Sequence, residues 1–167
     1  VRTANWLQTL LLPKAMPNIT GYAVASTYRA ARFVGGDYYD VLPQGSKLHM
    51  VIADVAGKGV PGLIGMSLCR NAMRSSMGLY PSPSKVLARA NEIIYDDLSR
   101  EMFISAFYAI LDMPSRTLVC ANAGHHPLLV YRKVTRTVER YLKIGGMALR
   151  MGRGAPFVQA LADQPVR

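Results

Sequence analysis

Two aspartates in this chain lie beside glycines at positions that suit metal binding. Asp37 follows two glycines, and Asp54 opens residues 54–59, which read Asp-Val-Ala-Gly-Lys-Gly. Acidic residues are otherwise scarce, with only seven aspartates and three glutamates among 167 residues. Carboxylate oxygens are preferred ligands of hard divalent cations such as Mg²⁺ and Mn²⁺. The pair therefore predicts a metal site, and a metal site there would imply hydrolytic chemistry.

The segments around the two aspartates predict a β-hairpin. Residues 36–42 and 47–55 are rich in aromatic and β-branched side chains, and residues 43–46 (Pro-Gln-Gly-Ser) are typical of a turn. Glycines at 57 and 59 would then let backbone approach the second strand closely.

The hairpin register decides whether the aspartates can meet. If Leu42 lies opposite Lys47, Asp37 and Asp54 project from one face as diagonal neighbours, roughly 7–8 Å apart. Asp40 has the opposite parity and should point away, although a one-residue bulge would reverse the faces. Taken singly, Asp37 could be a turn residue and Asp54 a helix cap. Their shared face favours metal binding.

These motifs occur in the order found in a known family. The chain resembles the SpoIIE/RsbU-type branch of the PP2C (PPM) metal-dependent serine/threonine phosphatases. The resemblance is carried by residues 11–13, 28–31, 34–40, 54–61, 91, 103–108 and 122–127. It implies an α/β fold of the α+β type, a PP2C-like sandwich of mainly antiparallel sheets flanked by helices. Gly-Gly-Asp alone is weak support, but with Asp-Val-Ala-Gly-Lys-Gly and Asn-Ala-Gly-His it is strong.

The resemblance also implies an activity and a ligand set. The activity is removal of phosphate from phosphoserine or phosphothreonine by water that two Mn²⁺ or Mg²⁺ ions activate. Asp54 would bridge both ions, Asp37 would bind one, and the backbone carbonyl of Val55 would be a further ligand. The implied substrate is a phosphorylated STAS-type anti-anti-sigma factor, and an upstream sensor domain is expected in the parent chain.

The chain departs from the family near its C-terminus. The family pattern continues into a Thr-Asp-Gly step and a later aspartate, both metal ligands, whereas this sequence ends at Arg167. Asp163 has the wrong surroundings to replace them. We expect a phosphatase domain that is cut short. The alternative is a catalytically incomplete regulatory or protein-binding domain that retains the fold.

Length and composition predict one domain, preceded by a connector. Residues 1–17 are expected to form a connecting helix or linker, or a helix on the domain's own core, and residues 18–167 the PP2C-like domain. No apolar run is long enough to span a membrane. Cys69 and Cys120 are isolated and are expected to be buried reduced thiols, which fits a cytoplasmic protein.

The net charge of +10 is concentrated near the C-terminus, with eight Lys or Arg against two acidic residues in residues 132–167. A basic chain raises the question of nucleic-acid binding. These charges are spread through expected strands, however, and not along a helix with interleaved aromatics. We therefore expect an acidic phosphoprotein partner and no nucleic acid. A homodimer is compatible with the sequence.

Further elements follow from periodicity and turn residues. Strands are expected at 22–28, 103–111, 116–121, 128–133 and 138–142, and helices at 59–78 and 83–99, the second with Ser82 as its N-cap. Leu63, Ile64, Leu68 and Ala72 should form the buried face of the first helix. Asn91 is expected to make an internal hydrogen bond. His125 is a weaker candidate for a role near the metal, in loop ordering or proton transfer, and His126 weaker still.

Overall fold

The computed structural model describes residues 2–29, 35–141 and 145–166. Its centre is an antiparallel sheet with the strand order β1-β2-β3-β4-β7. These strands are β1 (Tyr38–Gln44), β2 (Lys47–Val55), β3 (Ile104–Asp112), β4 (Thr117–Ala123) and β7 (Gln164–Val166). A separate hairpin is formed by β5 (Leu128–Arg132) and β6 (Thr137–Tyr141).

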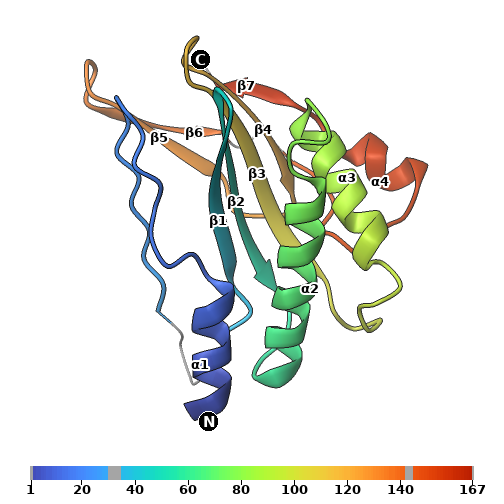
Figure 1. Ribbon diagram of the computed structural model, residues 1–167. Coiled ribbons are helices and arrows are strands. Elements are labelled where there is room, and N and C mark those ends of the chain that lie inside the picture. Colours follow the sequence, from blue (N-terminus) through green and yellow to red (C-terminus); the bar gives the residue numbers. More distant parts are fainter. Residues whose placement is uncertain (1, 30–34, 142–144, 167) are drawn as a thin grey trace.

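Helices cover one face of the central sheet, and the β5–β6 hairpin lies on the other side (Figure 1). The helices are α1 (Arg2–Leu11), α2 (Val60–Ser76), α3 (Pro83–Ile94) and α4 (Ala155–Ala160). The predicted fold class, mainly antiparallel sheets with helices, is confirmed. In the described part of the chain the second sheet has only the two strands of this hairpin.

The β1–β2 hairpin differs from the predicted register by two residues. Gln44 pairs with Lys47, so the turn is only Gly45 and Ser46, and Gly45 has the positive φ of 57° that such tight turns require. The prediction had ended the strand before Pro43. Pro43 instead continues β1, because β1 is an edge strand and a proline nitrogen there need not donate to a neighbour. At the opposite edge, β7 also contains a proline, Pro165.

The main core lies between the sheet and helices α2 and α3. The prediction for α2 was partly wrong: Leu63 and Ala72 are buried and Leu68 is partly buried, but Ile64 is 57% exposed. The buried face is completed by the two methionines Met66 and Met73, both at 0% exposure. Unbranched methionine fills irregular space between a helix and a twisted sheet more easily than isoleucine does. Cys69 and Cys120 are buried and free, as predicted.

An ion pair ties the first strand to α2. Asp40 lies on the helix-facing side of β1, is 1% exposed, and accepts a hydrogen bond from Nε of Arg74 at 2.7 Å. The hydroxyl of Tyr38 donates to the same carboxylate at 3.0 Å. The prediction that Asp40 points away from the other two aspartates is therefore confirmed.

Residues 22–28 do not form the predicted strand. Tyr22 makes an isolated bridge to Ile19, and residues 23–29 have no regular secondary structure. Burial nevertheless alternates along the start of this segment, where Tyr22 and Val24 are half-buried and Ala23 and Ala25 are exposed. The alternating pattern therefore predicts correctly that the start of this segment is buried on one side only. It does not show whether a neighbouring strand is present to pair with it.

The helix α3 is capped from a distant part of the chain. Ser82 makes no side-chain cap bond to the helix, contrary to the prediction. Asp163 takes this role: its Oδ1 accepts from the backbone N–H of Ser84 at 2.7 Å, and its Oδ2 accepts from the Ser82 hydroxyl. An aspartate beside a helix N-terminus is stabilised by the unpaired N–H groups there. Asn91 in the same helix makes the predicted internal bonds, to the backbone of Arg150 and Gly152.

The remaining strands follow the predictions within two residues, although Leu142, predicted to end β6, lies outside the described residues. None of the helices in the described ranges combines the length and apolarity of a membrane-spanning helix.

The β3–β4 loop offers a stability prediction. Arg116 is exposed and has a φ of 55°, a left-handed conformation that is unfavourable for a residue with an ordinary side chain. Asparagine tolerates this conformation, so Arg116→Asn should raise the free energy of unfolding by about 0.5–1 kcal/mol. Chemical denaturation measures the change. Arg116→Ala is the matched control, because alanine lacks the polar side chain whose local hydrogen bonds let asparagine tolerate this conformation; an equal gain in both variants would contradict the explanation.

Candidate metal centre

Asp37 and Asp54 come together where β1 begins and β2 ends. The observed register pairs Tyr38 with Ala53, and continuing it by one step places Asp37 opposite Asp54. Both carboxyl groups are exposed and lie close enough to share a hydrogen bond. The prediction that they share a face is confirmed. Because the register is shifted by two residues, each side chain stays on its predicted face of the sheet. Asp37 and Asp54 therefore lie directly opposite each other and not diagonally.

The electrostatics of the pair favour a bound cation. Partial burial raises the pKa of Asp37, and the negative charge and hydrogen bond of the Asp54 carboxyl raise it further. Such a rise occurs when two carboxylates repel each other without a neutralising positive charge. A divalent cation between them would supply that charge.

The Val55 carbonyl lies beside this pair because neighbouring residues lack side chains. A Cβ on Gly36 would lie 2.7 Å from the Val55 oxygen, so only glycine allows this approach. A Cβ on Gly62, in the first turn of α2, would lie 2.8 Å from the Gly57 oxygen and 3.7 Å from the Gly36 Cα. The start of α2 therefore contacts the loop that carries Asp37, and its N-terminal amides bring positive potential to the site.

A buried glutamine fixes the loop before Asp37. Gln8 of α1 is 1% exposed; its Nε2 donates to the Gly35 carbonyl at 2.7 Å and its Oε1 accepts from the Gly35 N–H at 3.2 Å. The same Nε2 donates to the Tyr28 hydroxyl at 2.7 Å. This clamp was missed by the sequence analysis. The sequence offers little sign of it, since Gln8 is one of several polar residues in the helix and the contact spans 27 positions of the chain. Residues 30–34, which contribute to the resemblance, lie outside the described residues.

The loop after β4 brings His125 to the same end of the sheet. Asn122 holds this loop, accepting from the His125 N–H at 2.6 Å and donating to the His125 carbonyl at 2.9 Å. The His125 ring bonds through Nδ1 to the hydroxyl of Ser105, which pairs with Asp54 across β2 and β3. Burial and His126 lower the pKa of His125, while the charge of Asp54 opposes this shift. His125 is thus a mainly neutral neighbour of the aspartate pair.

The donor set is small. In the part of the chain that the structure describes, no group of three or more His, Cys, Asp or Glu side chains could hold a metal ion. Asp163 is engaged at the N-terminus of α3 and is not part of this donor set. Two carboxylates and a carbonyl fit one hard divalent cation with water as its remaining ligands. They provide too few oxygens to hold two such ions tightly.

Comparison with known proteins agrees with the predicted resemblance. Residues 44–162 match the sequence profile of the family described as Stage II sporulation protein E (SpoIIE). The phosphoserine phosphatase RsbU of Bacillus subtilis (strain 168) is 34% identical over 156 residues, which are 93% of this chain and 46% of RsbU. The chain thus spans less than half the length of this relative.

Two solved structures share the fold. The RsbU and RsbW domains of Rv1364c from Mycobacterium tuberculosis superpose with a TM-score of 0.69 at 22% identity, over 83% of this chain and 37% of that one. The SiaA-PP2C domain of Pseudomonas aeruginosa gives a TM-score of 0.66 at 23% identity, over 80% of this chain and 51% of that one. At these identities the likeness concerns the fold alone.

Proposed function

Because the chain belongs to the SpoIIE family, we propose that it is a metal-dependent protein serine/threonine phosphatase, or the catalytic part of one. The observation that carries this proposal is the direct apposition of the Asp37 and Asp54 carboxyl groups. RsbU, a phosphoserine phosphatase, supports the reaction class by its 34% identity.

We assign Asp37, Asp54 and the carbonyl of Val55 as the protein ligands of Mn²⁺ or Mg²⁺. When bound, the cation would activate water and neutralise charge on the phosphoryl group. Asp54 lies within β2, whereas Asp37 lies just before β1 in a segment that Gln8 holds through Gly35. A neutral His125 leaves the negative charge of the pair available to the cation.

The proposed substrate is a phosphorylated protein of a bacterial partner-switching pathway, with a STAS-type anti-anti-sigma factor as its specific form. Support comes from RsbU, whose name gives it as a phosphoserine phosphatase, and from Rv1364c, in which RsbU and RsbW domains occur in one protein. The net charge of +10 suits an acidic phosphoprotein. The buried free cysteines are consistent with a cytoplasmic location. The upstream sensor domain, the boundary at residue 17 and the homodimer stay predictions.

Metal addition and removal test this proposal. We expect Mn²⁺ to produce hydrolysis of p-nitrophenyl phosphate, and an excess of EDTA to abolish it, because a divalent cation lowers the pKa of bound water and two carboxylates alone do not. The release of p-nitrophenol is measured for this chain and for the longer parent protein. Activity only in the parent would mean that residues outside this sequence complete the ligand set. Absence of activity in both would contradict the proposal.

The second candidate is a regulatory domain that binds a phosphoprotein without turning it over. It is favoured by the shortage of ligands, since the described residues offer only two carboxylates for metal. Two results together would support this candidate. A phosphorylated STAS-type protein would bind with an affinity that Mn²⁺ does not change, and neither this chain nor the longer protein would release phosphate from it.

The Gln8 clamp gives a prediction for metal affinity. Gln8→Ala removes both bonds to Gly35, so the loop carrying Asp37 should lose its fixed position. Loss of an outer contact that orients a ligand weakens metal binding by about 10–100-fold. Calorimetric titration with Mn²⁺ measures this affinity. Thr9→Ala, which changes an exposed hydroxyl on the same helix, should leave it unchanged; equal affinities for Gln8→Ala and wild type would rule out the clamp.

A further inference from the structure

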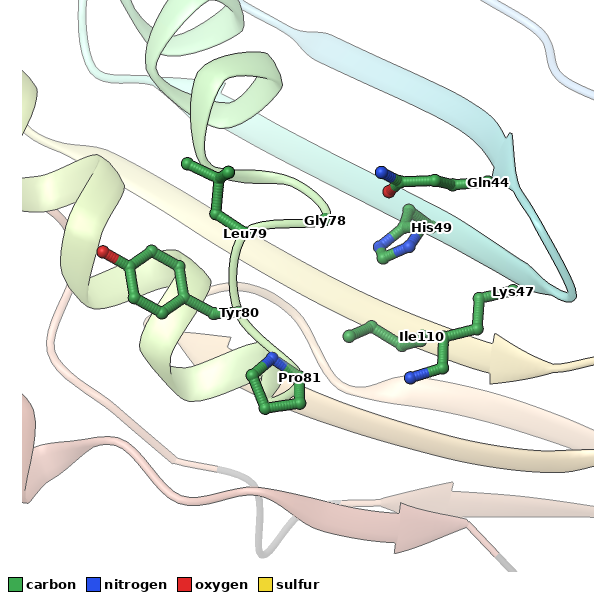
Figure 2. A pocket seen from close by; sticks show the side chains of 8 residues that line it. All are labelled: Gln44, Lys47, His49, Gly78, Leu79, Tyr80, Pro81 and Ile110. Carbon is green, nitrogen blue, oxygen red and sulfur yellow. The ribbon is translucent and has the colours of Figure 1, made fainter.

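A second polar cleft lies at the opposite end of the β1–β2 hairpin from the aspartate pair. It has a volume of about 270 Å³ and is lined by Gln44, Lys47, His49, Gly78, Leu79, Tyr80, Pro81 and Ile110. Figure 2 shows Gln44, Lys47, His49 and Ile110 on one side of this space and residues 78–81 on the other, with the side chains of Leu79 and Tyr80 extending away from the hairpin. Seven residues of strand separate Lys47 from Asp54, or roughly 23 Å at about 3.3 Å per residue. The cleft is therefore distinct from the proposed metal site.

A buried histidine contributes a directed hydrogen-bond donor to this cleft. His49 is 3% exposed, and its Nδ1 lies 2.6 Å from the hydroxyl of Tyr108, which is fully buried. His49 is the only hydrogen-bond partner that the described residues provide for this hydroxyl, and a buried O–H must donate. Tyr108 therefore donates to Nδ1, the ring proton lies on Nε2, and the Nε2–H is left for the cleft.

Two further side chains at the cleft can donate hydrogen bonds to an anion. Lys47 is half-buried at the first position of β2, and Gln44 precedes the turn of the same hairpin. Asp112, opposite Lys47 on β3, is the nearby acidic group; hydrogen bonds from Ser115 and, to a smaller extent, the charge of Lys47 lower its pKa. The cleft itself has an ammonium, an imidazole N–H and an amide among its lining side chains, and no carboxylate.

The remaining lining is apolar. Pro81 and Ile110 lie beside the polar groups, and the segment of Leu79 and Tyr80 completes the lining. A volume of about 270 Å³ suits only a small ligand. Asp112 and the C-terminal carbonyls of α2, just before Gly78, disfavour a doubly charged anion such as phosphate.

We propose that this cleft binds a small monocarboxylate with a short apolar chain, its carboxylate on the His49 Nε2–H and the Lys47 ammonium and its chain against Pro81 and Ile110. The inference does not depend on the phosphatase activity, because none of these residues belongs to the metal centre. Binding of a ligand to this cleft can therefore be measured without phosphatase activity.

Butyrate, acetate and inorganic phosphate are suitable probes, followed by the NMR resonances of the His49 imidazole. We expect a saturable shift with butyrate, weaker binding of acetate because it leaves the apolar walls empty, and weaker binding of phosphate. Lys47→Gln should weaken butyrate about tenfold, since it removes a charge-assisted bond. Lys85→Gln, an exposed lysine on α3, should change nothing.

A third variant tests the apolar part of the proposal. Pro81→Ala should reduce the preference for butyrate over acetate while leaving acetate affinity unchanged, because Pro81 would contact only the chain. The proposal is overturned if no carboxylate shifts the His49 resonances, if phosphate binds as tightly as butyrate, or if Lys47→Gln and Lys85→Gln behave alike.

Discussion

Replacing Asp54 by asparagine should lower the Mn²⁺-dependent kcat/KM for p-nitrophenyl phosphate on the order of a thousandfold. The aspartate pair has the only two carboxylates available to the proposed cation among the described residues, and asparagine removes half of their charge. A catalytic cation is worth several kcal/mol of transition-state stabilisation, and each 1.36 kcal/mol corresponds to about tenfold in rate. The measurement is made in whichever length of the protein is active.

Asp97→Asn is the matched control, because it makes the same substitution at an exposed position after α3; its activity should equal that of wild type. Thermal unfolding without metal separates loss of function from misfolding. The pKa of Asp37 is raised in the folded state, so its contribution to stability is present at low pH and is lost as pH rises through that pKa. Asp54→Asn removes the repulsion and should not be less stable than wild type at neutral pH. Activity within tenfold of wild type would refute the ligand assignment.

Removal of Arg74 should have the largest effect on stability. Arg74→Met leaves the Asp40 carboxylate, 1% exposed, with only neutral donors from Tyr38 and the Val41 N–H. Removing one member of a buried pair costs several kcal/mol because the other charge stays desolvated. Since the Arg74 side chain is 38% exposed, water can replace part of its contact, and we expect a loss of about 2–3 kcal/mol. Urea denaturation measures this loss.

The pair Arg89–Glu92 provides the comparison. Both side chains are about half exposed, and their nearest atoms are 3.0 Å apart. Arg89→Met should therefore cost less than about 0.5 kcal/mol. The double variant Arg74→Met with Asp40→Asn should recover part of the lost stability, because no unpaired charge is then buried. Equal losses of unfolding free energy in Arg74→Met and Arg89→Met would contradict the explanation. They would mean that the burial of Asp40 does not make the Arg74–Asp40 pair more stabilising than an exposed pair.

The shared face of Asp37 and Asp54 could be predicted from the sequence because it depends only on parity. The register itself was wrong by two residues, since Pro43 was taken as the end of a strand and is tolerated at the sheet edge. A slip of one residue would have destroyed the prediction, whereas a slip of two left it intact.

Contacts between distant segments could not be predicted in this way. Gln8 reaches Gly35 across 27 positions, and Asp163 reaches Ser84 across 79. In each of these two contacts the partner is a backbone atom, and the sequence does not mark which backbone atom a polar side chain will reach. Ile64 shows a further limit, because periodicity marks an apolar stripe but does not say which of its members the sheet covers.

The prolines in the two outermost strands bear on how the sheet meets other molecules. Pro43 in β1 and Pro165 in β7 both lie within paired strands. A proline nitrogen carries no hydrogen, so in each strand it faces the unpaired side of the sheet. A strand from another molecule that tried to extend the sheet at either edge would meet a missing donor in the middle of its new ladder. The sheet described here is thus guarded at both margins against edge-to-edge aggregation, and substituting either proline by threonine would remove that guard on one side.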